Sequence, residues 1–264
     1  MSVEELVVEG EGPVRIVRMN RPERLNAVNH ALHSALAGVW GPLAADPEVR
    51  AVVLTGAGTA FSAGGDMDYL RRVADDSDFR YRTMADARRI VTEMMAFHKP
   101  IIAAVNGPAV GLGCSLAVLS DVVFMADDAF FSDPHVTLGV VAADGGALAW
   151  PLMMSLLRAK EYLFTGDKIP AELAERLGLA NHIVPSVEVL DRSLALAQRL
   201  AQQPQQALWD TKRALNIHMS RSVLAVIDFA LASESETFAL PEFRSFLDAY
   251  TTKVGIGSTA DSSS

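Results

Sequence analysis

The sequence contains little cysteine, because Cys114 is the single one among its 264 residues. An internal disulfide is therefore excluded, and this composition fits a reducing cytosol. Basic residues are scarce too: 23 Lys and Arg stand against 32 Asp and Glu, and the formal net charge is −9. This balance argues against nucleic acid or an anionic membrane as a partner, since such binding depends on many basic contacts. A small anionic ligand is compatible with it, because such a ligand needs only a few well-placed donors.

A targeting segment is missing as well. The opening residues MSVEELVVEG contain no basic region followed by an apolar stretch, so no secretory signal is predicted. Residues 101–120 carry no charge and have the length of a membrane span. However, Pro108, Gly111 and Gly113 interrupt this segment, and these residue types disfavour a continuous helix. We therefore expect a buried core segment and a cytoplasmic protein.

Strand-like and helix-like patterns alternate in the first half of the chain. Continuous apolar runs at 51–55 and 101–105 are typical of parallel strands that are buried on both faces. Further strands are predicted at 6–8, 14–19, 121–125 and 182–184. Helices are predicted at 30–43, 66–97 and 116–119 and over most of 147–238. The order predicts an α/β core over residues 1–195, a helical region over 196–254 and a disordered tail over 255–264.

Two glycine-rich turns follow predicted strands and precede predicted helices, one at Phe61–Met67 and one at Asn106–Cys114. The start of a helix leaves backbone N–H groups unpaired, and glycine lets a ligand approach them closely. Two such turns that converge would form an oxyanion hole, in which each donor contributes a factor of about 10²–10³ in rate. Each turn alone is also compatible with an ordinary tight connection. Neither turn has the dinucleotide-binding pattern G-x-G-x-x-G or a phosphate-binding lysine.

Six segments in order resemble the crotonase superfamily, which is the enoyl-CoA hydratase/isomerase family. They are Asn20–Pro22 with Leu25–Ala27, Gly58–Met67, Lys99–Cys114, Asp121–Ala126, Leu163–Gly166 and Gly178–Ala180. The resemblance extends over nearly the whole chain. It implies an α/β fold built as a spiral of repeated strand–strand–helix turns, with a C-terminal helical region that forms a homotrimer or a dimer of trimers.

The resemblance also implies an acyl-CoA thioester as substrate. Its carbonyl oxygen is expected between the backbone N–H groups of Ala63 and Leu112, where it accepts the negative charge of an enolate. The adenine and pantetheine contacts are expected at Leu25, Asn26, Ala27, Gly64, Gly65, Asp66, Met67 and Gly111. No metal or redox cofactor is implied, and coenzyme A enters as part of the substrate.

The sequence departs from the family at the two glutamates that activate water in a hydratase, because the corresponding positions hold Ser115 and His135. Histidine has an unperturbed pKa of about 6.5 and is suited to general base catalysis. Asp144 follows nine positions later and is expected to orient the ring or to move a proton itself. The structural alternatives are a loop histidine bonded to a backbone carbonyl, and an aspartate that caps the helix near Ala147.

The His-then-Asp spacing is similar to a branch of the superfamily that cleaves C–C bonds in β-diketones by a retro-Claisen reaction. That branch also uses a glutamate from the C-terminal helices, for which Glu234 is the nearest candidate; its alternative role is a solvated helix carboxylate. Asp133 is a further acid, expected to point away from His135 if the segment is extended.

Three functions are therefore predicted: enolate chemistry on an acyl-CoA by a hydratase- or isomerase-like enzyme, C–C hydrolysis of a β-diketone, and a non-catalytic acyl-CoA-binding scaffold. The remaining histidines show no metal-ligand spacing and are expected in the core or on the surface: His30, His33, His98, His182 and His218.

Overall fold

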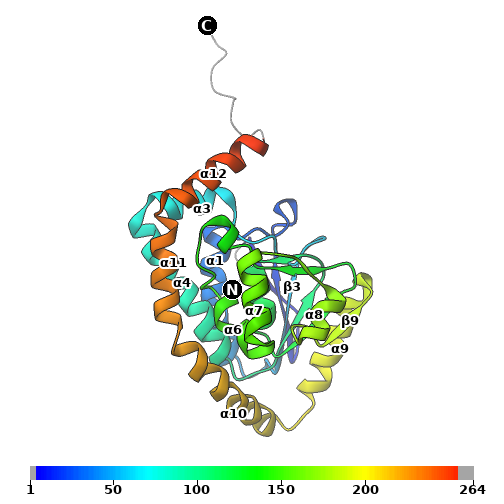
Figure 1. Cartoon of the computed structure of the whole chain (residues 1–264). Coiled ribbons are helices and arrows are strands. Elements are labelled where there is room, and N and C mark those ends of the chain that lie inside the picture. The colour runs from blue at the N-terminus through cyan, green and yellow to red at the C-terminus, as the bar shows by residue number, and fades with distance from the viewer. Residues whose placement is uncertain (1–3, 255–264) are drawn as a thin grey trace.

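A six-stranded sheet forms the centre of the computed structural model, which describes residues 4–254 (Figure 1). The predicted disordered tail, residues 255–264, lies outside the described residues. The strands lie in the order β1-β2-β3-β4-β6-β9, and each neighbouring pair is parallel except the antiparallel β1 and β2. They span Leu6–Glu9 (β1), Val14–Met19 (β2), Ala51–Gly56 (β3), Ile101–Val105 (β4), Val122–Ala126 (β6) and His182–Val184 (β9). Every residue of β3 and β4 is buried, as their apolar runs predict.

A second, three-stranded sheet has the order β5-β7-β8, with strands Ala109–Val110 (β5), Phe130–Ser132 (β7) and Ile169–Pro170 (β8). The chain alternates between the two sheets. It passes from β4 to β5 and the helix α5 (Leu112–Val118), and then from β6 to β7 and further helical turns. This strand–strand–helix order confirms the predicted fold class. The strands of the small sheet were not predicted, because two or three residues are too few to show a period.

The helices cover the sheets and extend to the C-terminal end of the described chain. They are α1 (His30–Gly38), α2 (Trp40–Ala45), α3 (Met67–Asp75), α4 (Ser77–Ala96), α6 (Gly146–Met153), α7 (Leu156–Thr165), α8 (Ala171–Leu177), α9 (Val189–Ala201), α10 (Gln205–Leu224), α11 (Ile227–Phe238) and α12 (Pro241–Val254). Short 3-10 turns lie at Pro22–Arg24, Val136–Leu138 and Ser186–Glu188. The last helix lies within the helical region predicted over 196–254, although its own bounds were not predicted.

Three predicted helices are broken in the structure. The predicted helix over 30–43 is interrupted at Val39, which separates α1 from α2. The predicted helix over 66–97 is interrupted at Asp76, which has an extended backbone and whose side chain accepts a hydrogen bond from the N–H of Phe79 (2.9 Å). Asp76 thus caps α4 instead of continuing α3, as short polar residues commonly do. The predicted helix from Ala147 to Leu157 ends at Met153, and Ser155 caps the next helix by accepting from the N–H of Arg158 (3.3 Å).

The C-terminal helices run along one side of the α/β core, with α11 beside α4 and α12 beside α3 (Figure 1). Tyr69, Phe79, Phe238 and Phe243 form a small apolar cluster between these helices. Lys212 of α10 is buried and pairs with Asp121 (2.6 Å) just before β6. The predicted boundary at residue 195 and the predicted trimer stay predictions, but this packing brings α11 and α12 to the site described below.

Among residues 4–254, no single helix is long and apolar enough to cross a membrane. The pair α10 and α11, bent by 46°, meets the length and composition test only when both helices are taken together.

Candidate active site

The two glycine-rich turns lie side by side. The N–H of Val110 in the second turn donates to the carbonyl of Ser62 in the first (2.9 Å), and Ser62 and Ala109 form a parallel bridge. Gly111 has a φ of +53°, and a Cβ placed there would come within 3.4 Å of His135 Cε1. Glycine is therefore required at this position both for its backbone conformation and for the close approach of the ring. The predicted convergence of the two turns is present.

The donor predicted in the first turn is wrong, because the N–H of Ala63 already donates to the carbonyl of Leu25 (2.9 Å). The segment around Val28 explains this. Val28 donates to the carbonyl of Gly64 (2.7 Å) and accepts from the N–H of Asp66 (3.0 Å), so these groups face Val28. Backbone groups of successive residues in an extended segment point to alternate sides, so the N–H of Gly65 points away from Val28.

Gly65 in the first turn and Leu112 in the second lie on the wall of a cavity, and their amides are unpaired in the described part of the chain. Within residues 4–254, neither N–H donates a hydrogen bond, and both residues line one cavity of about 340 Å³. Leu112 is the first residue of α5, where an N–H has no partner inside the helix. The predicted pair of donors therefore changes from Ala63 and Leu112 to Gly65 and Leu112.

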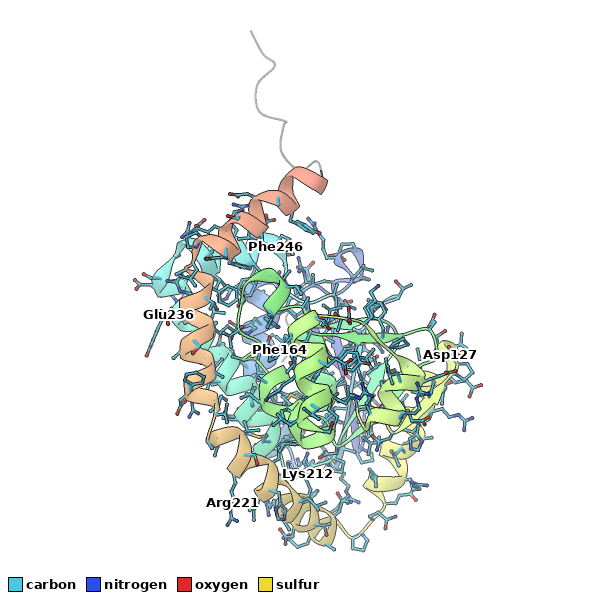
Figure 2. The ribbon with its side chains drawn as sticks, viewed as in Figure 1. Asp127, Phe164, Lys212, Arg221, Glu236 and Phe246 are labelled. Atoms are coloured by element: carbon cyan, nitrogen blue, oxygen red, sulfur yellow. The ribbon has the colours of Figure 1, made fainter. Side chains whose placement is uncertain are left out.

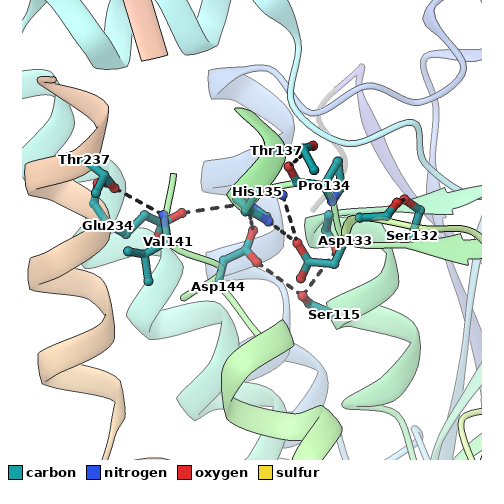
Figure 3. A network of polar contacts seen from close by, with 12 residues as sticks. Ser115, Ser132, Asp133, Pro134, His135, Thr137, Val141, Asp144, Glu234 and Thr237 are labelled. Carbon is teal, nitrogen blue, oxygen red and sulfur yellow. Dashed lines mark hydrogen bonds and ion pairs between the residues drawn. The ribbon is translucent and has the colours of Figure 1, made fainter. Parts of the chain in front are cut away.

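His135 lies in the loop after β7, and its Nδ1 contacts the Oδ1 atom of Asp133 (Figure 3). Asp133 is completely buried. The expectation that Asp133 points elsewhere is wrong, because the segment is not extended: His135 has helical φ and ψ and begins the 3-10 turn Val136–Leu138. With Nδ1 held by a carboxylate, Nε2 is the ring nitrogen left for chemistry.

Two further carboxylates face His135 Nε2. Asp144 Oδ2 lies at 3.8 Å and Glu234 Oε1 at 3.9 Å (Figure 3). Both distances exceed a direct hydrogen bond and match a gap that one oxygen atom can bridge. Both carboxylates are buried, with Glu234 only 3% exposed, so the alternative of a solvated helix carboxylate is wrong.

Neighbouring groups fix these carboxylates. The hydroxyl of Ser115 donates to Asp144 Oδ1 (3.3 Å), and the start of α6 receives no side-chain cap, so the capping alternative for Asp144 is also wrong. Glu234 reaches the site from α11. The N–H of Val141, in the loop that carries Asp144, donates to Thr237 Oγ1 (3.2 Å) and ties this loop to α11. Ser115 thus positions an acid and does not replace one.

The four titratable groups shift one another's pKa. Burial alone lowers the pKa of His135, but the charges of Asp133 and Asp144, the hydrogen bond that Asp133 accepts from the ring and the charge of Glu234 together raise it well above the usual value. Burial raises the pKa of Asp144, and His135 opposes this rise. Burial and the charge of Asp144 raise the pKa of Glu234 well above its ordinary value. A protonated His135 beside a carboxylate that tends to keep its proton is the resulting state.

The cavity that contains these groups is otherwise mainly apolar. Side chains from α3, α4, α11 and α12 form its far walls, among them Leu70, Val73, Phe238, Phe243 and Phe246. Figure 2 labels Phe246 on α12, beside α3. A mainly apolar cavity with a few convergent polar groups is the usual form of a small-molecule site.

The predicted coenzyme A contacts divide into two groups. Gly64, Gly65, Met67 and Gly111 line the cavity, whereas Leu25, Ala27 and Asp66 lie outside its lining. Asn26 is completely buried and cannot contact a ligand; its side-chain amide donates to the carbonyls of Ala57 and Ala60 (both 2.8 Å). Asn26 therefore holds the first turn in place, and its predicted binding role is wrong.

One cavity residue escaped prediction. His33 of α1 lines the same cavity and has no hydrogen bond on its ring within residues 4–254, yet its sequence surroundings contain no motif that marks it. In the same part of the chain, no group of three or more His, Cys, Asp or Glu side chains has the arrangement of a metal site.

Comparison with known proteins places the chain in a family. The family model described as "Enoyl-CoA hydratase/isomerase" matches residues 9–255. Short-chain-enoyl-CoA hydratase from Clostridium acetobutylicum is 33% identical over 239 residues, which cover 90% of this chain and 89% of that protein. A solved enoyl-CoA hydratase/isomerase from Mycobacterium paratuberculosis is 51% identical, with a TM-score of 0.92, and the match covers 94% of this chain and 98% of that one. A β-diketone hydrolase from Anabaena, solved with (S)-3-oxocyclohexyl acetic acid, is 28% identical with a TM-score of 0.83, and the match covers 89% and 94% of the two chains.

Proposed function

Because the chain belongs to the enoyl-CoA hydratase/isomerase family and is a crotonase-type enzyme, we propose that it acts on an acyl-CoA thioester through an enolate. The thioester oxygen lies between the N–H groups of Gly65 and Leu112, and His135 transfers the proton. The observation that supports this proposal is that two unpaired amides and an imidazole line the same cavity.

The chemistry follows from where charge develops. Adding a nucleophile to the β-carbon, or removing an α-proton, places negative charge on the thioester oxygen. Two N–H groups directed at that oxygen stabilise the enolate more than the neutral thioester, and one such donor is worth about 10²–10³ in rate. The protonated Nε2 of His135 then supplies the proton that the α-carbon takes up.

The water-activating role passes from the family's two glutamates to Asp144 and Glu234. Both carboxylates lie within 3.9 Å of His135 Nε2, although they come from different elements of the chain. A carboxyl group whose pKa is raised toward neutrality is a stronger base than an ordinary carboxylate. A water molecule held between these groups can therefore lose a proton to a carboxylate while His135 serves as the acid.

A second candidate is hydrolysis of a C–C bond in a β-diketone, and the position of Glu234 beside His135 and Asp144 favours it. Water adds to one carbonyl carbon, and the bond between that carbon and the central carbon breaks. Its electron pair forms an enolate on the second carbonyl, which His135 protonates, so the products are a carboxylic acid and a ketone. The Anabaena β-diketone hydrolase shares this fold over most of the chain.

The homotrimer or dimer of trimers stays part of the proposal. Large apolar side chains on α10 and α11 are exposed in the single chain, including Leu215 (65%) and Phe229 (76%). Burial of such side chains between copies is the expected reason for their presence. Light scattering after size-exclusion chromatography measures this, and a mass near the 28.4 kDa of one chain would contradict it.

The substrate class is tested by assaying crotonyl-CoA and 2,2-dimethylcyclohexane-1,3-dione side by side, with acetyl-CoA binding measured by calorimetry. Turnover of crotonyl-CoA with acetyl-CoA binding supports the first candidate. Ring opening of the diketone without acetyl-CoA binding supports the second. Acetyl-CoA binding without any turnover indicates the predicted non-catalytic scaffold and contradicts both.

The role of His135 is tested in the same assays. We expect His135→Gln to lower kcat by about 10²–10⁴, the usual contribution of a general acid or base. His218→Gln serves as the matched control, because His218 is exposed on α10 and lies outside the cavity. Equal activity of the two variants would contradict the role of His135.

A further inference from the structure

His33 is buried without a hydrogen-bond partner. It lies on α1, its exposed fraction is 4%, and it lines the cavity that also contains His135. Its Nδ1 is completely buried and has no hydrogen-bond partner between residues 4 and 254, so Nε2 is the ring nitrogen that a ligand in the cavity can reach. An unsatisfied polar group in a protein interior is unfavourable and rare, so each case calls for an explanation.

The ring is neutral at pH 7. Burial lowers the pKa of His33 to about 4, although the nearby charge of Asp86 opposes the shift. A neutral imidazole has one nitrogen that donates and one that accepts a hydrogen bond. His33 therefore offers an uncharged hydrogen-bonding group to whatever occupies the cavity.

The surroundings of His33 do not use this capacity. The ring of Tyr69 lies 5.8 Å from it between centroids, and the hydroxyl of Tyr69 donates to Thr83 Oγ1 (3.4 Å). The neighbouring cavity wall is formed by apolar side chains, among them Val28 and Ala87. A negatively charged ligand group on this wall would lose its hydration without gaining a counter-charge, because the charge near the ring is that of Asp86, whereas a neutral oxygen would gain a partner.

We propose that His33 is a specificity-determining residue that hydrogen-bonds a second, uncharged carbonyl or hydroxyl oxygen of the substrate. The inference rests on the proposed function for the place of the reacting carbonyl, at Gly65 and Leu112. The substrate is then a compact, mainly apolar molecule, or acyl group, with two oxygens: one at the paired amides and one at His33.

The test compares two neutral ligands that differ by one oxygen, 2,2-dimethylcyclohexane-1,3-dione and 2,2-dimethylcyclohexanone. Their binding is measured by calorimetry with wild type, His33→Phe and His33→Asn. One hydrogen bond predicts about three- to tenfold tighter binding of the diketone by wild type. His33→Phe abolishes this preference and leaves the affinity for the monoketone unchanged, whereas His33→Asn restores part of the preference through its neutral side-chain amide.

Two outcomes overturn the proposal: a diketone preference that survives in His33→Phe, and the absence of any such preference in wild type, including failure of both ketones to bind. A thermal melt accompanies the binding data, because replacing an unpaired ring by an apolar ring of similar shape is expected to keep the protein folded. His135→Gln separates this inference from the proposed function. It removes turnover if the proposed function is correct, but it leaves the diketone preference in place, since that preference depends on His33.

Discussion

The two histidines of the cavity show how the same side chain receives opposite properties from its neighbours. Burial lowers the pKa of both rings. At His33 burial prevails and the pKa falls to about 4, whereas at His135 three carboxylates reverse the direction and raise it well above the usual value. The charges around each ring, and not its depth, therefore decide which histidine carries a proton at pH 7.

Because of this difference, the two histidines are suited to different roles in the cavity. The protonated ring of His135, held by Asp133, can deliver a proton to a carbanion. The neutral ring of His33, on an apolar wall, is suited to hydrogen-bonding a substrate oxygen. Titratable groups whose environments push their pKa values apart commonly take different roles at functional sites. Single substitutions at these histidines and at the residues around them test this difference in role.

The largest expected effect comes from Asp133→Asn, which removes the charge that holds His135 Nδ1. We expect a loss in kcat of about 10²–10⁴, because an amide neither stabilises the imidazolium nor enforces the same ring tautomer. The pKa of His135 should also fall, which NMR titration of the imidazole measures directly. A merely structural role of Asp133 would leave this pKa unchanged.

The control for that variant is Asp127→Asn, which changes an exposed aspartate, labelled in Figure 2, that lies outside the cavity lining. It should retain wild-type kcat and the wild-type titration of His135. The pH profile gives a second check. If His135 donates a proton, wild-type activity declines as pH rises through the raised pKa of His135. In Asp133→Asn this decline should begin at a lower pH.

The next effect concerns stability in acid and isolates His33. The pKa of His33 in the folded chain is about 4, below the usual histidine value of 6.5, so between pH 4 and pH 6.5 the unfolded chain binds a proton that the folded chain does not. The stability contributed by a neutral His33 is therefore lost as pH falls from 6.5 toward 4, by about 3 kcal/mol. His33→Phe should flatten this acid limb in urea unfolding followed from pH 4 to 7. His218→Phe, at an exposed position, should retain the limb, and an equally steep limb in His33→Phe would contradict the assignment.

Much of this arrangement could be predicted from local sequence. The buried strands β3 and β4 follow from continuous apolar runs, and the meeting of the two turns follows from glycines that precede helices. His135 was identified because it stands where the family pattern and the sequence disagree, and Asp144 because it follows His135 at a spacing similar to the β-diketone branch of the superfamily.

The remainder depends on contacts between distant segments. The choice of Gly65 over Ala63 is made by hydrogen bonds to Leu25 and Val28, which no feature of the turn itself indicates. Asp133 contacts His135 only because the loop turns where an extended chain was expected. His33 lacks a hydrogen-bond partner because of the residues that the fold packs around its ring, and these come from distant parts of the chain.

The smallest expected effect concerns Glu234, one of the carboxylates that face His135. Burial and Asp144 raise the pKa of Glu234, so above its ordinary titration range the unfolded chain has released a proton that the folded chain still holds. Stability contributed by this protonated group is present at low pH and declines as pH rises. Glu234→Gln keeps the shape of the protonated carboxyl without the ionisation, so it should exceed wild type in stability at pH 8 by about 1 kcal/mol, with the difference shrinking toward pH 4.

Glu236→Gln, two positions along α11 at an exposed site (Figure 2), should show no such difference. Equal urea midpoints of the two variants at both pH values would contradict this prediction. Burial would then not oppose the ionisation of Glu234, and only the charges of Asp133 and Asp144 would distinguish His135 from His33.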